Sequence, residues 1–339
     1  MAIYYWVGGT GTWDNSSTTN WSTTSGGTGG AGYPLSIDDV IFDTNSGTGT
    51  ITSSSSNFAR CSNFTWSTTS SFIFLAGSPN VYGNITITSG ASNCGAAITL
   101  SAITTGKTIT TNGYSIAKLT FNGVGGEWTL QDNLTTTYTL GFSIIFVAGT
   151  LNSNDKTITS PGISISGSSI KILNLGFSNV LFESWQNTST NLTITGFYTL
   201  VFNASSGLNQ FLPGSNFVYN NLKLHGTGQL RIANSTTFNN ITNDVSPTTL
   251  RLNGNIIVTN LALVGSAGNL VTINSYTGIQ YRITQTTGTA AGNYLYIRNI
   301  ATTGGAYFYA GANSTDGGGN LGWIFSNAPP PTTSGFFYF

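Results

Sequence analysis

The Asp and Glu residues are the first groups in the chain that could do chemistry, because glycosidases need two carboxyl groups at a set separation. Glu127 and Asp132 are the most plausible pair, but they lie five residues apart. In an unbroken strand an odd spacing places two side chains on opposite faces. A lyase-type site would combine several acids around Ca²⁺ with a basic residue. Lys107, Lys118 and Lys156 are available as basic residues, but no acids cluster around them in the sequence. We therefore predict no catalytic residue and place the acids at turns.

Three further acids, Asp38, Asp39 and Asp43, could supply hard oxygen ligands to Ca²⁺. The spacing of an EF-hand and that of the calcium-binding nonapeptide repeat are both absent. Asp is common in a turn that precedes a strand, and Asp316 among glycines fits the same explanation. We predict no metal site and no cofactor.

Nucleophilic chemistry has little support in the sequence. His225 is the single histidine, no Gly-x-Ser-x-Gly motif is present, and we expect His225 at a turn or on the surface. Cys61 and Cys94 are 33 residues apart and form no Cys-x-x-Cys pair, so zinc is not expected. We expect buried free thiols, with one disulfide as the alternative. The glycine run at 8–11 lacks the strand before it and the Lys-Ser/Thr helix after it that a phosphate loop requires.

Aromatic residues are abundant and leave two interpretations open. Trp66, Trp128 and Trp185, with several tyrosines, could stack on sugars from a flat β face. The same residues could instead fill the interior as stacked rings. The sequence alone does not choose between them.

The composition excludes several classes of protein. Only 6 % of the 339 residues are charged, with 10 Lys+Arg against 10 Asp+Glu, whereas an ordinary domain has about 25 %. Zero net charge without a basic run argues against nucleic-acid binding. The longest apolar runs, such as 144–148, are far below the ~20 residues of a membrane helix, so we expect no membrane insertion. No Sec signal peptide is visible at the start, although the neutral, hydroxyl-rich composition is typical of extracellular proteins.

The elements that must position these residues are strands. Good helix formers are scarce, and short alternating runs recur at 84–88, 162–166, 192–195 and 261–264. An Asn followed by an apolar residue opens many runs, with spacings of 21 residues or of 19 and 20 residues: Asn63 and Asn84, then Asn221, Asn240 and Asn260. A period near 20 predicts an all-β, single elongated parallel β-solenoid, although a jelly roll or sandwich would also show short, regularly spaced strands.

This fold would explain the low charge, because each position stacks on its like in the next turn. Columns of Asn, Thr, Ser and Ile are stable, and we expect columns of like charge to be absent because they repel. We expect an N-terminal aromatic and Gly-rich cap at 1–60, a solenoid body at 61–325, and a Pro-rich linker with an aromatic tail at 326–339. The tail is a candidate assembly or docking element, formed by Phe336, Phe337, Tyr338 and Phe339.

Three segments resemble the β-solenoid type of phage tail-fibre and virion-appendage protein, and more distantly the Trp-Asp…Asn-Trp repeats of autotransporter passengers. The segments are YYWVGGTGTWD at 4–14, continuing through NWS at 20–22 and DDVIFD at 38–43; LTFNG, GGEWTLQDNL and AGTLN within 119–152; and NSTDGGGN and GWIF within 313–325.

The resemblance implies a β-solenoid in a virion and brings no catalytic motif. We expect a non-enzymatic structural virion protein of a bacteriophage, a tail fibre or other capsid or tail appendage, for host-surface attachment or particle decoration. Expected partners are copies of the chain (a trimer by analogy), other virion proteins and a host-surface glycan. The alternative is a bacterial surface adhesin or a polysaccharide-degrading β-helix enzyme.

Overall fold

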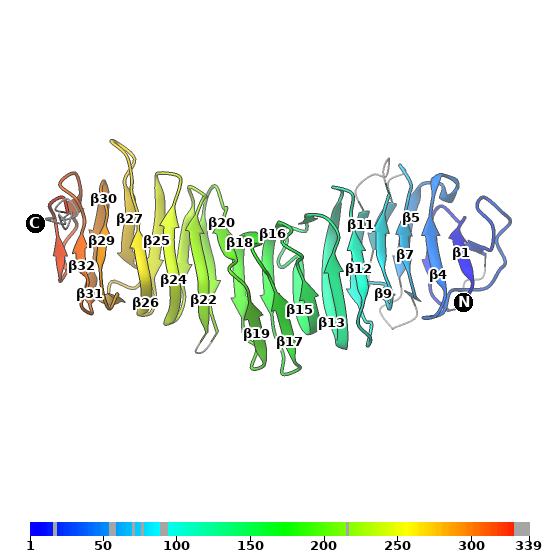
Figure 1. Cartoon of the computed structure of the whole chain (residues 1–339). Coiled ribbons are helices and arrows are strands. Elements are labelled where there is room, and N and C mark those ends of the chain that lie inside the picture. The colour runs from blue at the N-terminus through cyan, green and yellow to red at the C-terminus, as the bar shows by residue number, and fades with distance from the viewer. Residues whose placement is uncertain are drawn as a thin grey trace, which may run out of the picture. The chain divides into compact units, whose positions relative to one another are not determined.

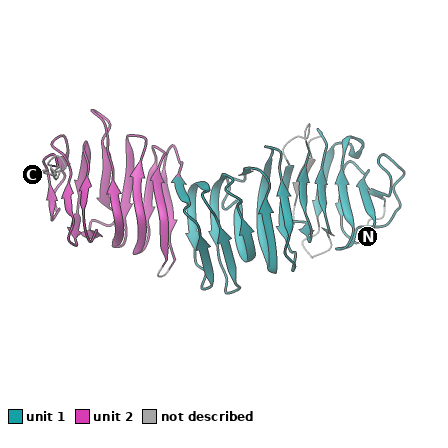
Figure 2. Cartoon of the chain, viewed as in Figure 1, with its two compact units in different colours: residues 1–201 teal, residues 202–339 magenta. Residues whose placement is uncertain are grey.

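The structure is a computed structural model that describes residues 1–15, 19–53, 59–69, 72–75, 78–88, 94–214 and 217–328. The chain is all-β and forms a parallel β-solenoid of about 12 turns, as the alternating runs and the period near 20 predicted. A single 3₁₀ turn, η1 (Thr44–Ser46), interrupts the described strands. Figure 1 shows the strands of successive turns, and Figure 2 shows two compact units, residues 1–201 and 202–339.

The strands of unit 1 pair with strands of the preceding and following turns. They are β1 (Ile3–Trp6), β2 (Gly11–Trp13), β3 (Trp21–Ser22), β4 (Asp39–Phe42), β5 (Gly49–Ser53), β6 (Arg60–Cys61), β7 (Phe64–Trp66), β8 (Phe72–Leu75), β9 (Asn80–Val81), β10 (Ile85–Ile87), β11 (Cys94–Leu100), β12 (Lys107–Thr110), β13 (Ser115–Leu130), β14 (Leu134–Thr136), β15 (Ile144–Asn152), β16 (Ile158–Ile165), β17 (Lys171–Asn174), β18 (Asn179–Asn187) and β19 (Leu192–Thr195), and β20 (Thr199–Phe202) contains the boundary.

Unit 2 repeats the arrangement with three parallel ladders: β21–β23–β25–β27–β30–β33, β22–β24–β26–β28–β31 and β29–β32–β34. Its strands are β21 (Leu208–Leu212), β22 (Val218–Leu224), β23 (Gln229–Ile232), β24 (Thr236–Asn243), β25 (Thr248–Leu252), β26 (Ile256–Ala262), β27 (Val271–Ser275), β28 (Tyr281–Thr284), β29 (Thr289–Ala291), β30 (Leu295–Arg298), β31 (Ile300–Thr303), β32 (Tyr307–Tyr309), β33 (Thr315–Asp316) and β34 (Trp323–Ile324). No boundary between two units was visible in the sequence.

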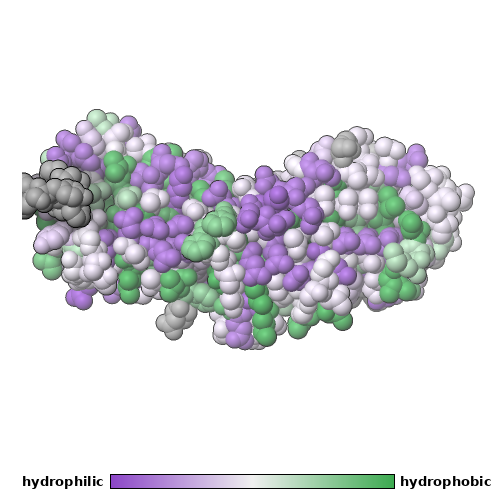
Figure 3. All heavy atoms as spheres, in the orientation of Figure 1, coloured by the Kyte–Doolittle hydropathy of each residue, from purple (hydrophilic) through white to green (hydrophobic). Residues whose placement is uncertain are grey.

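Interior side chains form columns because in-register parallel strands stack like positions. In unit 2, Leu230, Leu250, Ile273 and Ile297 occupy one register position on β23, β25, β27 and β30, and all are fully buried. Strands alternate inward and outward residues, so each turn contributes a few apolar side chains to a continuous core. Burying each such side chain stabilises the fold by about 1.5–3 kcal/mol. Figure 3 shows one side of the molecule, on which hydrophilic residues (purple) are interspersed with hydrophobic ones (green).

The first turn is packed by aromatic rings. Strand β3 pairs antiparallel with β1, in contrast to the parallel pairs of the solenoid, and aligns Trp21 with Trp6. The rings of Trp6 and Phe42 stack with their centroids 5.9 Å apart, and Phe42 lies 5.2 Å from Trp66 in the next turn. Strand β1 also pairs parallel with β4, so solenoid pairing begins inside the segment that we expected to be a cap.

Asparagine ladders connect the turns on the outside, at the positions that the sequence period indicated. Asn221, Asn240 and Asn260 are in register on β22, β24 and β26, and Nδ2 of Asn240 donates to Oδ1 of Asn221 at 2.6 Å. In unit 1, Oδ1 of Asn63 accepts the backbone N–H of Asn84 at 2.8 Å, and Nδ2 of Asn63 donates to Asp39 at 2.8 Å. The Asn63 amide therefore satisfies polar groups of two neighbouring turns.

We predict that Asn63→Ala lowers the free energy of unfolding by about 1–3 kcal/mol, because the N–H of Asn84 and the carboxylate of Asp39 lose a partner. The matched control is Thr65→Ala, at a half-buried outward residue of β7, the strand that follows Asn63; no side-chain hydrogen bond is found for Thr65 among the described residues. It should change the value by no more than about 0.5 kcal/mol. Urea denaturation followed by circular dichroism measures both, and equal effects would contradict the role of the ladder.

Candidate functional site

The N-terminal acids serve the backbone and not a common ligand. Asp38 is buried and accepts the N–H groups of Ala2 at 2.7 Å and Leu35 at 3.1 Å. Asp43 caps the 3₁₀ turn by accepting the N–H of Asn45 at 2.9 Å. No group of three or more His, Cys, Asp or Glu side chains within the described ranges is placed to hold a metal ion. These carboxylates are therefore turn and capping residues.

Glu127 and Asp132 have different surroundings. Glu127 lies on β13 and is half-buried, and no hydrogen bond or ion pair is found for its carboxylate among the described residues. Asp132 lies beyond the end of that strand and accepts both the N–H of Thr111 at 2.9 Å and its hydroxyl at 2.8 Å. The Asp132 carboxylate therefore connects two neighbouring turns.

The tryptophans considered for sugar stacking belong to the interior. Trp66 and Trp128 are fully buried and Trp185 is 1 % exposed, so a glycan cannot reach their rings. The alternative of interior stacking is correct for these three residues. Phe121, for example, meets Trp128 edge-on with centroids 5.7 Å apart. Each indole fills the centre of a turn, where its large apolar surface is worth more than on a face in water.

Both cysteines are free and buried, as expected. Burial, with a smaller contribution from Asp39, raises the pKa of Cys61 well above its ordinary value. Burial raises the pKa of Cys94 to about 12. The thiolate is the reactive form of cysteine, so neither residue is set up as a nucleophile.

The glycine run at 8–11 surrounds a side chain of its own chain. A Cβ on Gly8 would come within 2.4 Å of Oδ1 of Asn20, and one on Gly11 within 2.5 Å of Nδ2. The glycines therefore allow the loop to close on the Asn20 amide, which donates to the carbonyl of Thr12 at 3.2 Å. This contact explains the motif without a phosphate. The expectation that no strand precedes the run was wrong, because β1 (Ile3–Trp6) ends just before Gly8.

His225 belongs to an exposed ion cluster on the surface of unit 2. Asp244 contacts Nζ of Lys223 at 2.5 Å and Nδ1 of His225 at 2.8 Å. Burial acts to raise the pKa of Asp244, but hydrogen bonds from Lys223 and His225, together with their charges, hold it below its usual range. An exposed pair of this kind contributes little to stability.

Lys171 is the one lysine that the described structure buries completely. It opens β17, and its Nζ donates to the carbonyls of Val147 at 3.3 Å, Gly167 at 3.0 Å and Ser169 at 2.5 Å. No carboxylate forms an ion pair with it within the described ranges. Burial lowers its pKa, because the charged form loses water. Lys171 therefore satisfies carbonyls at a corner of the solenoid.

Arginines form a column on the outside of unit 2. Arg231 on β23 is in register with Arg251 on β25, and Asn274 on β27 separates Arg251 from Arg298 on β30. The apolar neighbours of each arginine on its strand are buried, so the arginines lie on the outward face. We call Arg231, Arg251 and Arg298 the arginine column. We call this column together with three neighbouring residues the arginine face. The three neighbours are Gln210 and Asn274, which lie in the same register, and Tyr276, whose ring lies beside Arg231.

The arginine column overturns the expectation that like charges never stack in adjacent turns. Arg231 has stabilising contacts of its own, because it donates to Oε1 of Gln210 and its guanidinium lies 4.6 Å from the centre of the Tyr276 ring. A delocalised guanidinium stacks on aromatic faces and is weakly hydrated, so it tolerates this position better than an ammonium group would. Sequence reasoning missed the column, although Leu-Arg-Ile at 230–232 and Leu-Arg-Leu at 250–252 repeat at the solenoid period.

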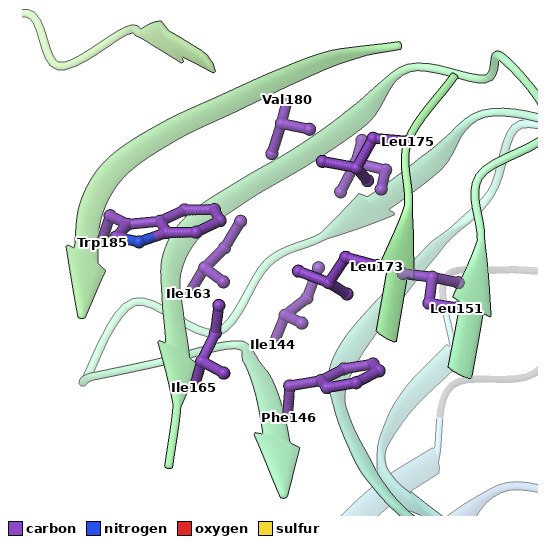
Figure 4. Close-up of a pocket in the computed structure, with 10 residues that line it drawn as sticks. Ile144, Phe146, Leu151, Ile163, Ile165, Leu173, Leu175, Val180 and Trp185 are labelled. Carbon is purple, nitrogen blue, oxygen red and sulfur yellow. The ribbon is translucent and has the colours of Figure 1, made fainter. Parts of the chain in front are cut away.

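A small void lies in the interior of unit 1. Figure 4 labels side chains that line this void, and they point toward one another. The volume of the void is about 20 Å³, and the side chains that line it are all apolar, with Ile144 and Trp185 among them. A void of this size holds at most one water molecule and offers no polar partners to keep it. It is a packing defect and not a substrate site.

In comparisons with known proteins, no family model, no curated protein and no solved structure matches the chain. None of the helices that the structure describes has the length and hydropathy to cross a membrane. The proposed docking tail, Phe336 to Phe339, lies outside the described residues.

We predict that Lys171→Met lowers the free energy of unfolding by about 1–3 kcal/mol near neutral pH, because three carbonyls lose their shared donor. The pKa of Lys171 in the folded protein is below the unfolded value of about 10.4. Between these two values the unfolded chain binds the proton that the folded protein has released. The stability of the wild type relative to the variant should therefore rise with pH through that window.

Urea denaturation of both proteins from about pH 7 to about pH 10 measures this difference, since the window ends near the lysine pKa of about 10.4. A difference that stays constant or falls as the pH rises would contradict the assignment. Lys156→Met, at a half-buried lysine whose side chain has no hydrogen bond within the described ranges, is the control and should show no such trend.

Proposed function

We propose that the chain is a non-enzymatic structural protein of a bacteriophage particle, a tail fibre or another capsid or tail appendage. Its solenoid attaches the particle to a host surface or decorates the particle. Its partners in this proposal are copies of itself, as a trimer by analogy with phage fibres, other virion proteins and a host-surface glycan. The place of action is the virion, outside the cell after release.

The observation that carries the proposal is that uncharged polar side chains connect neighbouring turns of the solenoid. The Asn63–Asn84 and Asn221–Asn240 contacts join neighbouring turns without charge, and such ladders suit a self-supporting, neutral scaffold. The similarity of 4–14 and 313–325 to phage appendage proteins is what favours a virion over other settings.

A non-enzymatic role is favoured by the way the reactive residues are used. Asp38, Asp43 and Asp132 accept hydrogen bonds from backbone N–H groups, and the pKa values of both thiols are raised. General acid–base catalysis needs a group within reach of a substrate proton and with a pKa near the working pH. The alternative is a bacterial surface adhesin or a polysaccharide-degrading enzyme. One observation supports it, the exposed contact between His225 and Asp244 at 2.8 Å.

The virion role predicts that the chain co-purifies with phage particles. Particles from a lysate of cells that carry the gene would be banded on a density gradient and analysed by mass spectrometry. We expect the chain in the infectious band at a constant ratio to the major capsid protein. Its presence only in the soluble or membrane fractions would overturn the proposal.

The non-enzymatic role predicts no cleavage of polysaccharide. The purified chain, incubated with capsular or exopolysaccharide, should release no new reducing ends and no unsaturated ends. Asp244→Asn is the matched variant, because it removes the carboxylate that holds Lys223 and His225. Cleavage by the wild type that is lost in Asp244→Asn would establish the enzymatic alternative.

A further inference from the structure

The arginine column has no carboxylate partner among the residues that the structure describes. Among the described residues the ion pairs involve the N-terminus with Asp38, and Lys223 and His225 with Asp244. Residues 202–339 contain five Lys and Arg but two acids, Asp244 and Asp316. Asp244 already pairs with Lys223 and His225, so it does not neutralise the arginine column, which remains positively charged on the surface.

Asp316 does not neutralise the column either. It lies one turn beyond β30, in register with Ile297, next to the position of Arg298. Its Oδ1 accepts the N–H of Gly318 at 2.9 Å and Nδ2 of Asn320 at 2.6 Å. The carboxylate is thus held in its own turn and makes no ion pair with Arg298.

The solenoid sets the spacing of the charges. Neighbouring parallel strands lie about 4.7–4.9 Å apart, so Arg231 and Arg251 are one such step apart and Arg298 is two steps further. Arg298 is exposed and Arg251 is half-buried with its Nε enclosed, and neither makes a side-chain hydrogen bond within the described ranges. Arg231 is already oriented by Gln210 and the Tyr276 ring. The result is a preformed row of cations along successive turns.

The residues beside the column fit a sugar polymer. Tyr276 is 38 % exposed and its ring orients the Arg231 guanidinium, while Gln210 and Asn274 supply amide groups in the same row. Thr249, Thr272 and Tyr296 form the neighbouring outward row on β25, β27 and β30 and supply hydroxyls. The hydroxyls of a sugar pair with amides and hydroxyls, and the carboxylates of an acidic sugar pair bidentately with arginine.

We propose that the arginine face binds an acidic polysaccharide that lies along the solenoid turns, with its uronate carboxylates paired to Arg231, Arg251 and Arg298. The inference rests on the proposed attachment function, for which it names the class of host-surface glycan. Nucleic acid is the less fitting polyanion, because sequence-independent binding of its phosphates requires many more cations than this face provides.

The test uses the full chain and a panel of polygalacturonate, alginate and hyaluronate, with neutral dextran as the negative probe. Isothermal titration calorimetry should detect binding to at least one acidic polymer, weakened by added salt because the contacts are ionic. Arg251→Gln should weaken that binding about tenfold or more. Arg282→Gln removes the same charge from β28, outside the arginine face, and should change the affinity less than about twofold.

Tyrosine variants separate stacking from folding. Tyr276→Phe keeps the ring under Arg231 and should retain binding, whereas Tyr276→Ala should weaken it several-fold. Circular dichroism and the urea midpoint of each variant should match the wild type, since these residues lie on the surface.

The inference is overturned if no acidic polymer of the panel binds, if Arg251→Gln binds as well as Arg282→Gln, or if a single-stranded oligonucleotide binds more tightly than every acidic polysaccharide. These results are independent of the particle test. A chain found in phage particles that fails to bind loses only the present inference. A chain that binds but is absent from particles loses the virion role and keeps the binding face.

Discussion

Hydrogen bonding between parallel strands of successive turns is the constraint on which the rest of the structure depends. It repeats the backbone at a fixed interval, so every residue is placed against the residue one turn away. Inside, this requirement selects apolar columns such as Leu230, Leu250 and Ile273. Outside, it selects side chains that can pair with copies of themselves, as Asn221 and Asn240 do. The low charge of the chain follows from the same requirement.

Most groups with chemical potential are used to satisfy this architecture. Asp43 and Asp132 accept N–H groups at turns, and Lys171 donates to three carbonyls at a corner. A buried polar group without a partner is costly, so a solenoid with many corners needs such residues. The arginine column differs because no carboxylate among the described residues pairs with its charges, although Arg231 donates to Gln210 and stacks on Tyr276. A local feature that breaks the rule of the architecture is a reasonable place to look for binding.

Several elements were predictable from residue order alone, because their signals are local or periodic. The Asn-apolar spacing indicated a solenoid and located the register of Asn221, Asn240 and Asn260. For Glu127 and Asp132 the odd spacing applies only to an unbroken strand, and residue order did not show that β13 ends at Leu130, before Asp132. The arginine column is encoded by the same period, but charge repulsion alone predicts that it should not form. Tyr276 and Gln210, which come from other turns, hold Arg231 in place.

The sequence by itself determined the all-β class, the period near 20 and the scarcity of titratable groups, because strand alternation and repeat spacing are properties of residue order. Only the tertiary structure decided which aromatic rings are interior, as for Trp66, Trp128 and Trp185, and which charges are left unpaired, as for Arg251. Inward and outward positions depend on where each strand joins its turn. The partner of a charge depends on which turns stack beside it. Both are settled by contacts between residues about 20 or more positions apart, which local pattern does not specify.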